Sequence, residues 1–329
     1  MRFLDTEMSP LGMGCWPIGG AMFSGDEPLG YTNVNDDQSI RAIHAALACG
    51  ITLFDTAPAY GAGHAERLLA HALKDRPDAL IATKIGVGVD EASKQLTGNE
   101  SDPKSVIPAI EQSLSRLERD RIDLLLLHLN SLSVAQANAI FDEVDKARQS
   151  GKVRYYGWST DFSQSAAAVA GRPAFVAVEH AMNVLLDAPQ MEKVVQQNSL
   201  TALIRSPLAM GLLSGRYGAD DLMREDDIRA TSNPRTDYFA KGRANPSFLA
   251  KLDAVRELLM MDGRSLVQGA IGWLWAKDGA NVPIPGARTE GQIEGIAGAL
   301  TFGALPQDVM VQIETLIERE PASSPERAR

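Results

Sequence analysis

Residues 51–83 read ITLFDTAPAY GAGHAERLLA HALKDRPDAL IAT, and they contain one complete strand–helix–strand unit. The apolar run 51–54 predicts a strand, 65–73 has the apolar spacing of a helix, and 79–83 predicts the next strand. Two strands joined through a helix pair in parallel, with the helix as a right-handed crossover. This unit therefore predicts an α/β fold with a parallel sheet.

The same alternation extends in both directions from this unit. Upstream, residues 1–16 predict a small hairpin followed by a first strand, and 37–49 predict a helix that Gly50 ends. Downstream, strands are predicted at 122–127, 153–158, 175–178, 200–204 and 281–284, and helices from Pro103 onward and at 134–149, 163–170, 189–197, 265–277 and 290–300. About eight such units favour a (β/α)8 TIM barrel with an N-terminal β-hairpin and long loops at its C-terminal face.

The alternative to the barrel is an open, doubly wound sheet. Such a sheet usually carries a Gly-x-Gly-x-x-Gly turn after its first strand. Gly19 and Gly20 have neither the spacing nor the context of that turn. The barrel is therefore the preferred prediction.

Two stretches interrupt the alternation. Residues 86–102 are rich in Gly, Asp and Asn, and residues 214–245 are polar and rich in Asp and Arg. A loop as long as 214–245 is usually a functional lid or disordered, and both interpretations stay open. We find no interdomain linker, so we expect a single domain over residues 1–329, with a polar tail at 320–329.

The composition excludes several classes of partner. The chain has 32 Lys and Arg against 42 Asp and Glu, a net charge of −10, which argues against nucleic acid and against an anionic membrane surface. The N-terminus lacks the apolar segment of a signal peptide, and no run is long enough to span a membrane. Cys15 and Cys49 are too few for a disulfide framework, and we predict no metal site. A cytoplasmic protein fits these features.

Four reactive side chains fall at or just beyond the ends of three consecutive predicted strands: Asp55, Tyr60, Lys84 and His128. In a βα barrel these strand ends converge on one mouth. A tyrosine is a weak acid at neutral pH, but a nearby ammonium lowers its pKa, and a carboxylate fixes the ammonium in place. A histidine can donate a hydrogen bond to an oxygen on which negative charge develops. Together they predict an active site that protonates a carbonyl oxygen.

Four motifs together resemble the aldo-keto reductase family: FDTAPAYG at 54–61, ATKIG at 82–86, LLH at 126–128 and IPGAR at 284–288. The resemblance runs in the family's order from about residue 11 to about residue 300. It implies a (β/α)8 barrel and an NADPH cofactor that lies extended across the barrel mouth. It also implies a catalytic tetrad in which Tyr60 donates the proton, Lys84 and Asp55 tune it, and His128 orients the carbonyl.

The resemblance places the nicotinamide among residues that depart from the family pattern. Ser159 matches a residue that binds the nicotinamide amide, while Thr160 replaces its usual Asn neighbour. Glu179 stands where the family has Gln, and Arg205 stands where it often has an aromatic residue stacked on the ring. We expect Arg205 to pair with Glu179, because a carboxylate would offset the repulsion between the guanidinium and the oxidised, cationic ring.

Further cofactor contacts are implied at Ser206, Leu208, Gly211, Ile284, Gly286, Arg288 and Gln292. Arg288 matches the family position near the adenosine 2′-phosphate. It precedes a predicted helix, where both the helix dipole and the guanidinium favour an anion. This favours NADPH over NADH. Gln292 matches an adenine-side residue, although Ile296 replaces the Asn that usually follows it.

For the substrate, Trp16 and His128 are the predicted contacts, and we expect a small carbonyl compound or the corresponding alcohol. Two other functions stay open. The family includes potassium-channel β subunits, which keep the barrel and modulate a partner protein. A Schiff-base aldolase with Lys84 as nucleophile is the third interpretation. The oligomeric state is left open.

Overall fold

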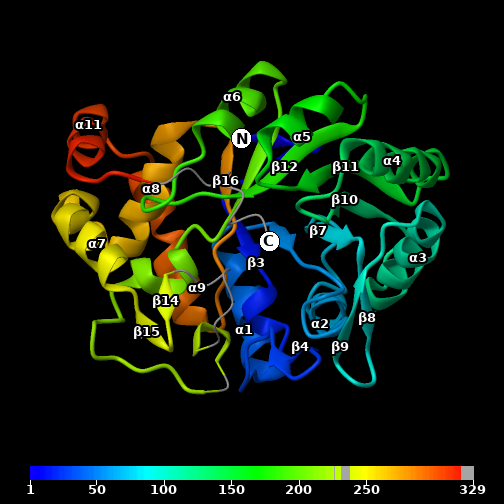
Figure 1. Cartoon of the computed structure of the whole chain (residues 1–329), viewed down its shortest axis with the longest axis horizontal. Coiled ribbons are helices and arrows are strands. Elements are labelled where there is room, and N and C mark those ends of the chain that lie inside the picture. Colours follow the sequence, from blue (N-terminus) through cyan, green and yellow to red (C-terminus); the bar gives the residue numbers. More distant parts are fainter. Residues whose placement is uncertain (226, 231–237, 320–329) are drawn as a thin grey trace.

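The computed structural model describes residues 1–225, 227–230 and 238–319 (Figure 1). Eight parallel strands form one sheet in the order β16-β13-β12-β11-β10-β7-β6-β3. They are β3 (Gly12–Gly14), β6 (Leu53–Asp55), β7 (Leu80–Ile85), β10 (Ile122–Leu127), β11 (Val153–Ser159), β12 (Phe175–Ala181), β13 (Thr201–Arg205) and β16 (Asn281–Pro283). Each strand pairs with its neighbour in the chain order of the barrel strands, as βα units require.

The first and last strands meet and close the sheet into a barrel. A parallel bridge joins Gly14 to Gly286, and the Gly14 amide donates to the Pro285 carbonyl at 3.1 Å. Only glycine fits this seam, since a Cβ on Gly14 would lie 2.6 Å from the Ile284 carbonyl oxygen. The predicted (β/α)8 barrel is confirmed, and the open sheet is wrong.

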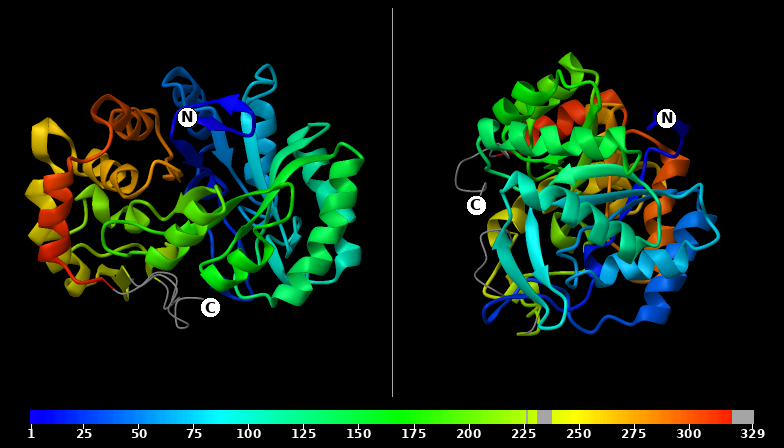
Figure 2. Two further views of the ribbon diagram at one scale, coloured as in Figure 1. Left: turned by 90° about the horizontal axis from the view of Figure 1, so that it is seen from above. Right: turned by 90° about the vertical axis from the view of Figure 1, so that its right-hand side faces the viewer.

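Helices surround the strands in both views of Figure 2. They are α1 (Asp36–Ala48), α2 (His64–Ala72), α3 (Val106–Leu117), α4 (Val134–Gln149), α5 (Ser163–Val169), α6 (Pro189–Gln197), α7 (Pro246–Leu259), α8 (Leu266–Lys277), α9 (Glu290–Ala297), α10 (Ala299–Phe302) and α11 (Gln307–Leu316). Side chains of Asn35, Ser133 and Thr289 accept hydrogen bonds from the first turns of α1, α4 and α9. The helices α7 and α11 are additions to the predicted series.

The predicted N-terminal hairpin is present as β1 (Arg2–Phe3) and β2 (Thr6–Glu7). Its apolar side chains Phe3 and Leu4 are buried in one cluster with the inward-facing leucines of the barrel strands, such as Leu53 and Leu124. The hairpin therefore packs against the barrel's interior layer, while the opposite end, where the strands finish, stays available for a site.

The loops at that end form an accessory sheet that the sequence pattern did not predict. The strands β4 (Phe23–Ser24) and β5 (Glu27–Pro28) come from the loop after β3, and β8 (Val87–Asp90) and β9 (Gln95–Asn99) lie in the glycine-rich stretch 86–102. They form one sheet in the order β5-β4-β9-β8, which is visible below the barrel in Figure 1. The strands are short and polar, and lack the apolar alternation by which strands are predicted.

The stretch 214–245 has local structure in its described parts. The 3₁₀ helix η3 (Ala209–Ser214) leads into it, and it contains η4 (Ile228–Ala230) and the hairpin β14 (Phe239–Ala240) and β15 (Arg243–Ala244). The Ile228 side chain is buried beside Met22 and Leu29 from the N-terminal loop. Residues 226 and 231–237 of this stretch, and the predicted tail 320–329, lie outside the described residues. Across the parts of the chain that are described, no helix is long and apolar enough to cross a membrane.

Candidate active site

The four residues predicted from the strand ends come together at the barrel mouth. Asp55 ends β6, Tyr60 lies in the loop that follows, Lys84 lies near the end of β7, and His128 follows β10. The Lys84 Nζ donates to both Asp55 carboxylate oxygens at 2.6 and 2.8 Å and to the Tyr60 hydroxyl at 3.3 Å. The His128 and Tyr60 rings meet edge to face, 6.4 Å apart between centroids. A continuous polar chain thus runs from Asp55 through Lys84 to Tyr60.

The central lysine is a buried cation. The Lys84 side chain is fully buried, and burial alone would lower its pKa, but the carboxylates of Asp55 and Glu179 raise that pKa well above its usual value. Burial and the charge of Glu179 raise the pKa of Asp55 against the effect of Lys84. Lys84 therefore stays an ammonium at neutral pH.

The pKa of the Tyr60 hydroxyl differs in one respect from what the sequence predicted. Lys84 does lower the pKa of this phenol, as predicted, but burial raises it by more, so the pKa lies above the ordinary value of 10.0. The effect of the ammonium on this pKa was considered from the sequence, but the larger effect of burial was not. Tyr60 therefore keeps its proton at neutral pH, and Lys84 reduces the free-energy cost of giving that proton up.

The predicted pair between Arg205 and Glu179 is replaced by two other pairs. The Glu179 carboxylate lies 3.2 Å from Lys84 Nζ and accepts a hydrogen bond from the Ser159 hydroxyl at 3.0 Å. Arg205 instead pairs with Asp161, just after the end of β11. This outcome corrects the prediction, because Glu179 on β12 faces the ammonium of Lys84, whereas Asp161 reaches Arg205 beside it.

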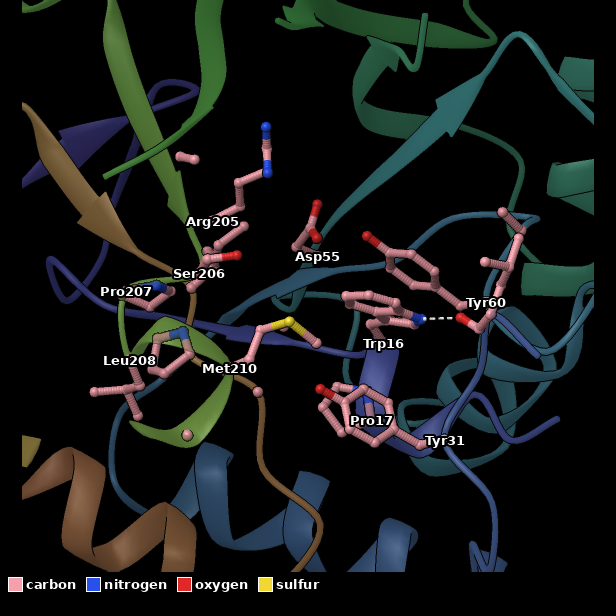
Figure 3. A pocket seen from close by; sticks show the side chains of 18 of the residues that line it. Trp16, Pro17, Tyr31, Asp55, Tyr60, Arg205, Ser206, Pro207, Leu208 and Met210 are labelled. Carbon is pink, nitrogen blue, oxygen red and sulfur yellow. Dashed lines mark hydrogen bonds between the residues drawn. The ribbon is translucent and has the colours of Figure 1, made fainter. Parts of the chain in front are cut away.

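One cavity of about 1210 Å³ opens at this mouth. It is lined by three members of the tetrad and by each residue that the sequence assigned to cofactor or substrate: Asp55, Tyr60, His128, Trp16, Ser159, Glu179, Arg205, Ser206, Leu208, Gly211, Ile284, Gly286, Arg288 and Gln292. Lys84 lies beneath its floor and reaches the cavity through Tyr60. Figure 3 shows Asp55, Tyr60 and Trp16 on one side of this space and Arg205 to Leu208 on the other.

Comparison with known proteins identifies the family of this chain. The model of the aldo/keto reductase family matches residues 10–318. The chain belongs to the aldo/keto reductase family. It is thus an oxidoreductase of that family, and the family prediction and the enzyme prediction are confirmed.

The relatives include aldo-keto reductase YhdN of Bacillus subtilis, 30% identical, covering 95% of this chain and 91% of that protein. A chloroplastic pyridoxal reductase of Arabidopsis thaliana is 28% identical, over 96% of this chain and 85% of that protein. The solved glycerol dehydrogenase of Gluconobacter oxydans is 29% identical with a TM-score of 0.78, covering 95% and 92% of the two chains. Related reductases include ones named for NADP(+) and for NADH.

Beside Tyr60, aromatic rings pack on the tetrad and line the cavity of this reductase. Trp16 stacks beside Tyr60 with ring centroids 6.2 Å apart, and Tyr31 meets Trp16 edge to face at 5.4 Å. The Trp16 indole nitrogen donates to the Leu29 carbonyl at 3.2 Å, the dashed contact in Figure 3, which fixes the ring. Beyond them, Ser24, Glu27, Thr97 and Asn99 of the accessory sheet line the rim, and no sequence signal marked these four.

Arg288, just before α9, lines the cavity beside Tyr31, with its guanidinium 5.9 Å from the centroid of that ring. The Arg288 side chain donates to the carbonyls of Thr32 and Asn33 at 2.7 and 3.0 Å, and its backbone amide donates to the Gln292 side chain at 2.8 Å. Arg216 and Arg229 line the same cavity, although the sequence analysis did not single them out. Arg229 pairs with Asp227, which offsets its charge.

Proposed function

We propose that this reductase converts an aldehyde or ketone to the alcohol with hydride from NADPH, or runs the reverse oxidation of an alcohol or sugar. The observation that supports it most is the chain of contacts from Asp55 through Lys84 to Tyr60, ending in the cavity. This arrangement supplies a proton at a fixed place beside a site that a flat ring and a small carbonyl compound can share.

Each residue of the proposed active site has a role that follows from its surroundings. Tyr60 holds the proton that the carbonyl oxygen takes up as hydride arrives at the carbon. Lys84 stabilises the phenolate that Tyr60 becomes, and Asp55 holds Lys84 in position by accepting two hydrogen bonds. His128, packed against the edge of Tyr60, is placed to donate to the same oxygen. Trp16 covers the reacting atoms and excludes water from that side.

The residues of the cavity fit a nicotinamide cofactor, which supplies the hydride when bound. Glu179 lines the cavity wall, where a nicotinamide carboxamide would meet it. Ser159 lies beside it. The adenosine end would be held by Arg288 and Gln292, and the guanidinium charge of Arg288 favours NADPH, which carries a 2′-phosphate, over NADH.

The geometry of Lys84 counts against a Schiff-base aldolase. A nucleophilic lysine must lose its proton, and here two carboxylates within 3.2 Å hold that proton in place. For a regulatory subunit, the cavity and tetrad would look the same, so turnover is the measurement that separates it from an enzyme.

The proposal is tested by following NADPH absorbance over a panel of aldehydes, ketones and sugars. We expect turnover with part of the panel, and we expect Tyr60→Phe to lose at least about 100-fold in kcat, because the variant has no proton to donate. Tyr31→Phe is the matched control, since it removes another hydroxyl from the same cavity at a distance from Lys84, and it should lose far less. Full activity in Tyr60→Phe would refute the mechanism.

A further inference from the structure

Three charged side chains are buried in contact with one another beside the cavity. Lys84 lies between Asp55 and Glu179, with Nζ 2.6 Å from Asp55 Oδ1 and 3.2 Å from Glu179 Oε2. The exposed fractions of the three side chains are 0%, 3% and 2%. Two carboxylates and one ammonium sum to a charge of −1. A net charge buried away from water costs free energy unless a proton or a nearby opposite charge neutralises it.

The surrounding groups do not remove this excess charge. Those whose ionisation responds to the cluster come from just after β3, from β6 and the loop after it, from β7, from β12 and from β13: Cys15, Asp55, Tyr60, Lys84, His180 and Arg205. Burial raises the pKa of the Cys15 thiol, which is therefore neutral at pH 7. Arg205 is already matched by Asp161, and burial keeps His180 neutral at pH 7 by lowering its pKa to about 4. The protonated Tyr60 is neutral. The sum for the whole group therefore stays at −1 when both carboxylates beside Lys84 are ionised.

Two observations point to a proton as the missing positive charge. Burial and the charge of Glu179 raise the pKa of Asp55, so the two carboxylates resist being ionised together. Glu179 Oε2 lies within ion-pair distance of Lys84, yet no hydrogen bond reaches it from the described part of the chain. A proton placed on one carboxyl group neutralises the cluster. Both Asp55 and Glu179 line the cavity, so that proton can exchange with water.

We propose that the buried cluster of Asp55, Lys84 and Glu179 holds one exchangeable proton on a carboxyl group, and that this proton leaves to water when the oxidised nicotinamide binds. This inference rests on the proposed function. The oxidised ring carries one positive charge, which matches the charge of −1 on the ionised cluster. The reduced ring is neutral and leaves the proton where it is. Glu179 thereby makes the cavity favour the oxidised cofactor increasingly as pH rises.

The proposal has a quantitative signature in binding alone. Because binding of the oxidised form releases a proton, the ratio of the dissociation constants of NADP+ and NADPH falls with rising pH, by up to about tenfold per pH unit. Any protonation change at the 2′-phosphate is common to both forms and cancels in this ratio. No catalytic step enters the measurement.

The test is isothermal titration of NADP+ and NADPH into the protein, in pairs of buffers with different ionisation enthalpies and at several pH values. In the wild type we expect NADP+ to release close to one proton more than NADPH. In Glu179→Gln, where Lys84 and Asp55 form a neutral pair, this difference disappears. There we also expect NADP+ to bind at least about tenfold more weakly relative to NADPH at high pH.

Ser159→Ala is the matched control, because it removes the hydroxyl bonded to Glu179 and leaves the charge in place. It should weaken both cofactor forms alike and keep the difference in proton release. The inference is wrong if the wild type shows no difference between the two forms, or if Glu179→Gln keeps that difference. If the wild type binds neither form, the proposed function itself fails. Circular dichroism of each variant verifies that it is folded.

Discussion

At the scale of single residues, Arg288 offers the clearest test of cofactor choice. Its guanidinium lines the cavity, donates from one terminal nitrogen to the backbone carbonyls of Thr32 and Asn33, and lies over the Tyr31 ring, 5.9 Å from its centroid. Arg288→Ala should raise the Michaelis constant for NADPH by about tenfold or more and that for NADH far less, since NADH lacks the 2′-phosphate. Steady-state kinetics with both cofactors measure this.

Arg41 provides the control for Arg288. It lies on α1 and pairs with Glu290 in the first turn of α9, the helix that follows Arg288, but it does not line the cavity. Arg41→Ala should leave both Michaelis constants unchanged. Equal effects of Arg288→Ala on NADPH and NADH would contradict the role in phosphate binding.

The residues of the tetrad could be predicted because each follows a recognisable apolar strand or lies in the loop just after one. Position along the chain was enough to bring Asp55, Lys84 and His128 to one mouth. The partner of Arg205 could not be predicted in this way. It depends on which side chains of neighbouring strands face each other, and Glu179 on β12 faces Lys84 across the barrel interior. Asp161, the actual partner, stands two residues beyond Ser159 and carries no motif of its own.

At the scale of elements, the seam between β3 and the segment after β16 decides whether the barrel closes. Gly14→Ala would place a Cβ 2.6 Å from the backbone oxygen of Ile284, and neither strand can move without opening the seam. We expect a loss of about 1 to 3 kcal/mol in unfolding free energy. Denaturant unfolding measures it. Weaker cofactor binding should accompany this loss, because Gly286 lines the cavity.

Gly279→Ala serves as the comparison for the seam. A Cβ at Gly279 meets nothing within 4 Å, so this variant should be close to neutral in stability. If Gly14→Ala is equally neutral, the seam is not held as tightly as the geometry implies.

Among the elements, the strand 122–127 and the helices 134–149 and 189–197 have the bounds that the sequence predicted. Their apolar spacing and their flanking Gly, Ser and Pro residues make them predictable from the local sequence alone. The accessory sheet could not be predicted from the sequence. Its strands β4 and β9 come from loops far apart in sequence and pair at one position, Phe23 with Gln95. Short polar strands form here because the barrel brings two loops together, not because of local propensity.

At the scale of the whole molecule, stability in acid should depend on one histidine. His180 is 1% exposed, and burial is the main cause that lowers its pKa from 6.5 to about 4. As pH falls through this range, the unfolded chain takes up a proton that the folded protein resists. Stability present above pH 6.5 is therefore lost progressively toward pH 4, by about 3 kcal/mol from this residue.

His180→Gln removes this titration while keeping a polar side chain at the position. We expect its unfolding free energy to fall less steeply than that of the wild type between pH 6.5 and 4, with the two curves converging or crossing in acid. Urea unfolding at half-unit pH steps measures the difference. His71→Gln, on the exposed side of α2, should follow the wild-type curve. Parallel curves for His180→Gln and the wild type would show that some other group governs acid unfolding, because the folded and unfolded states would then bind protons alike at this position.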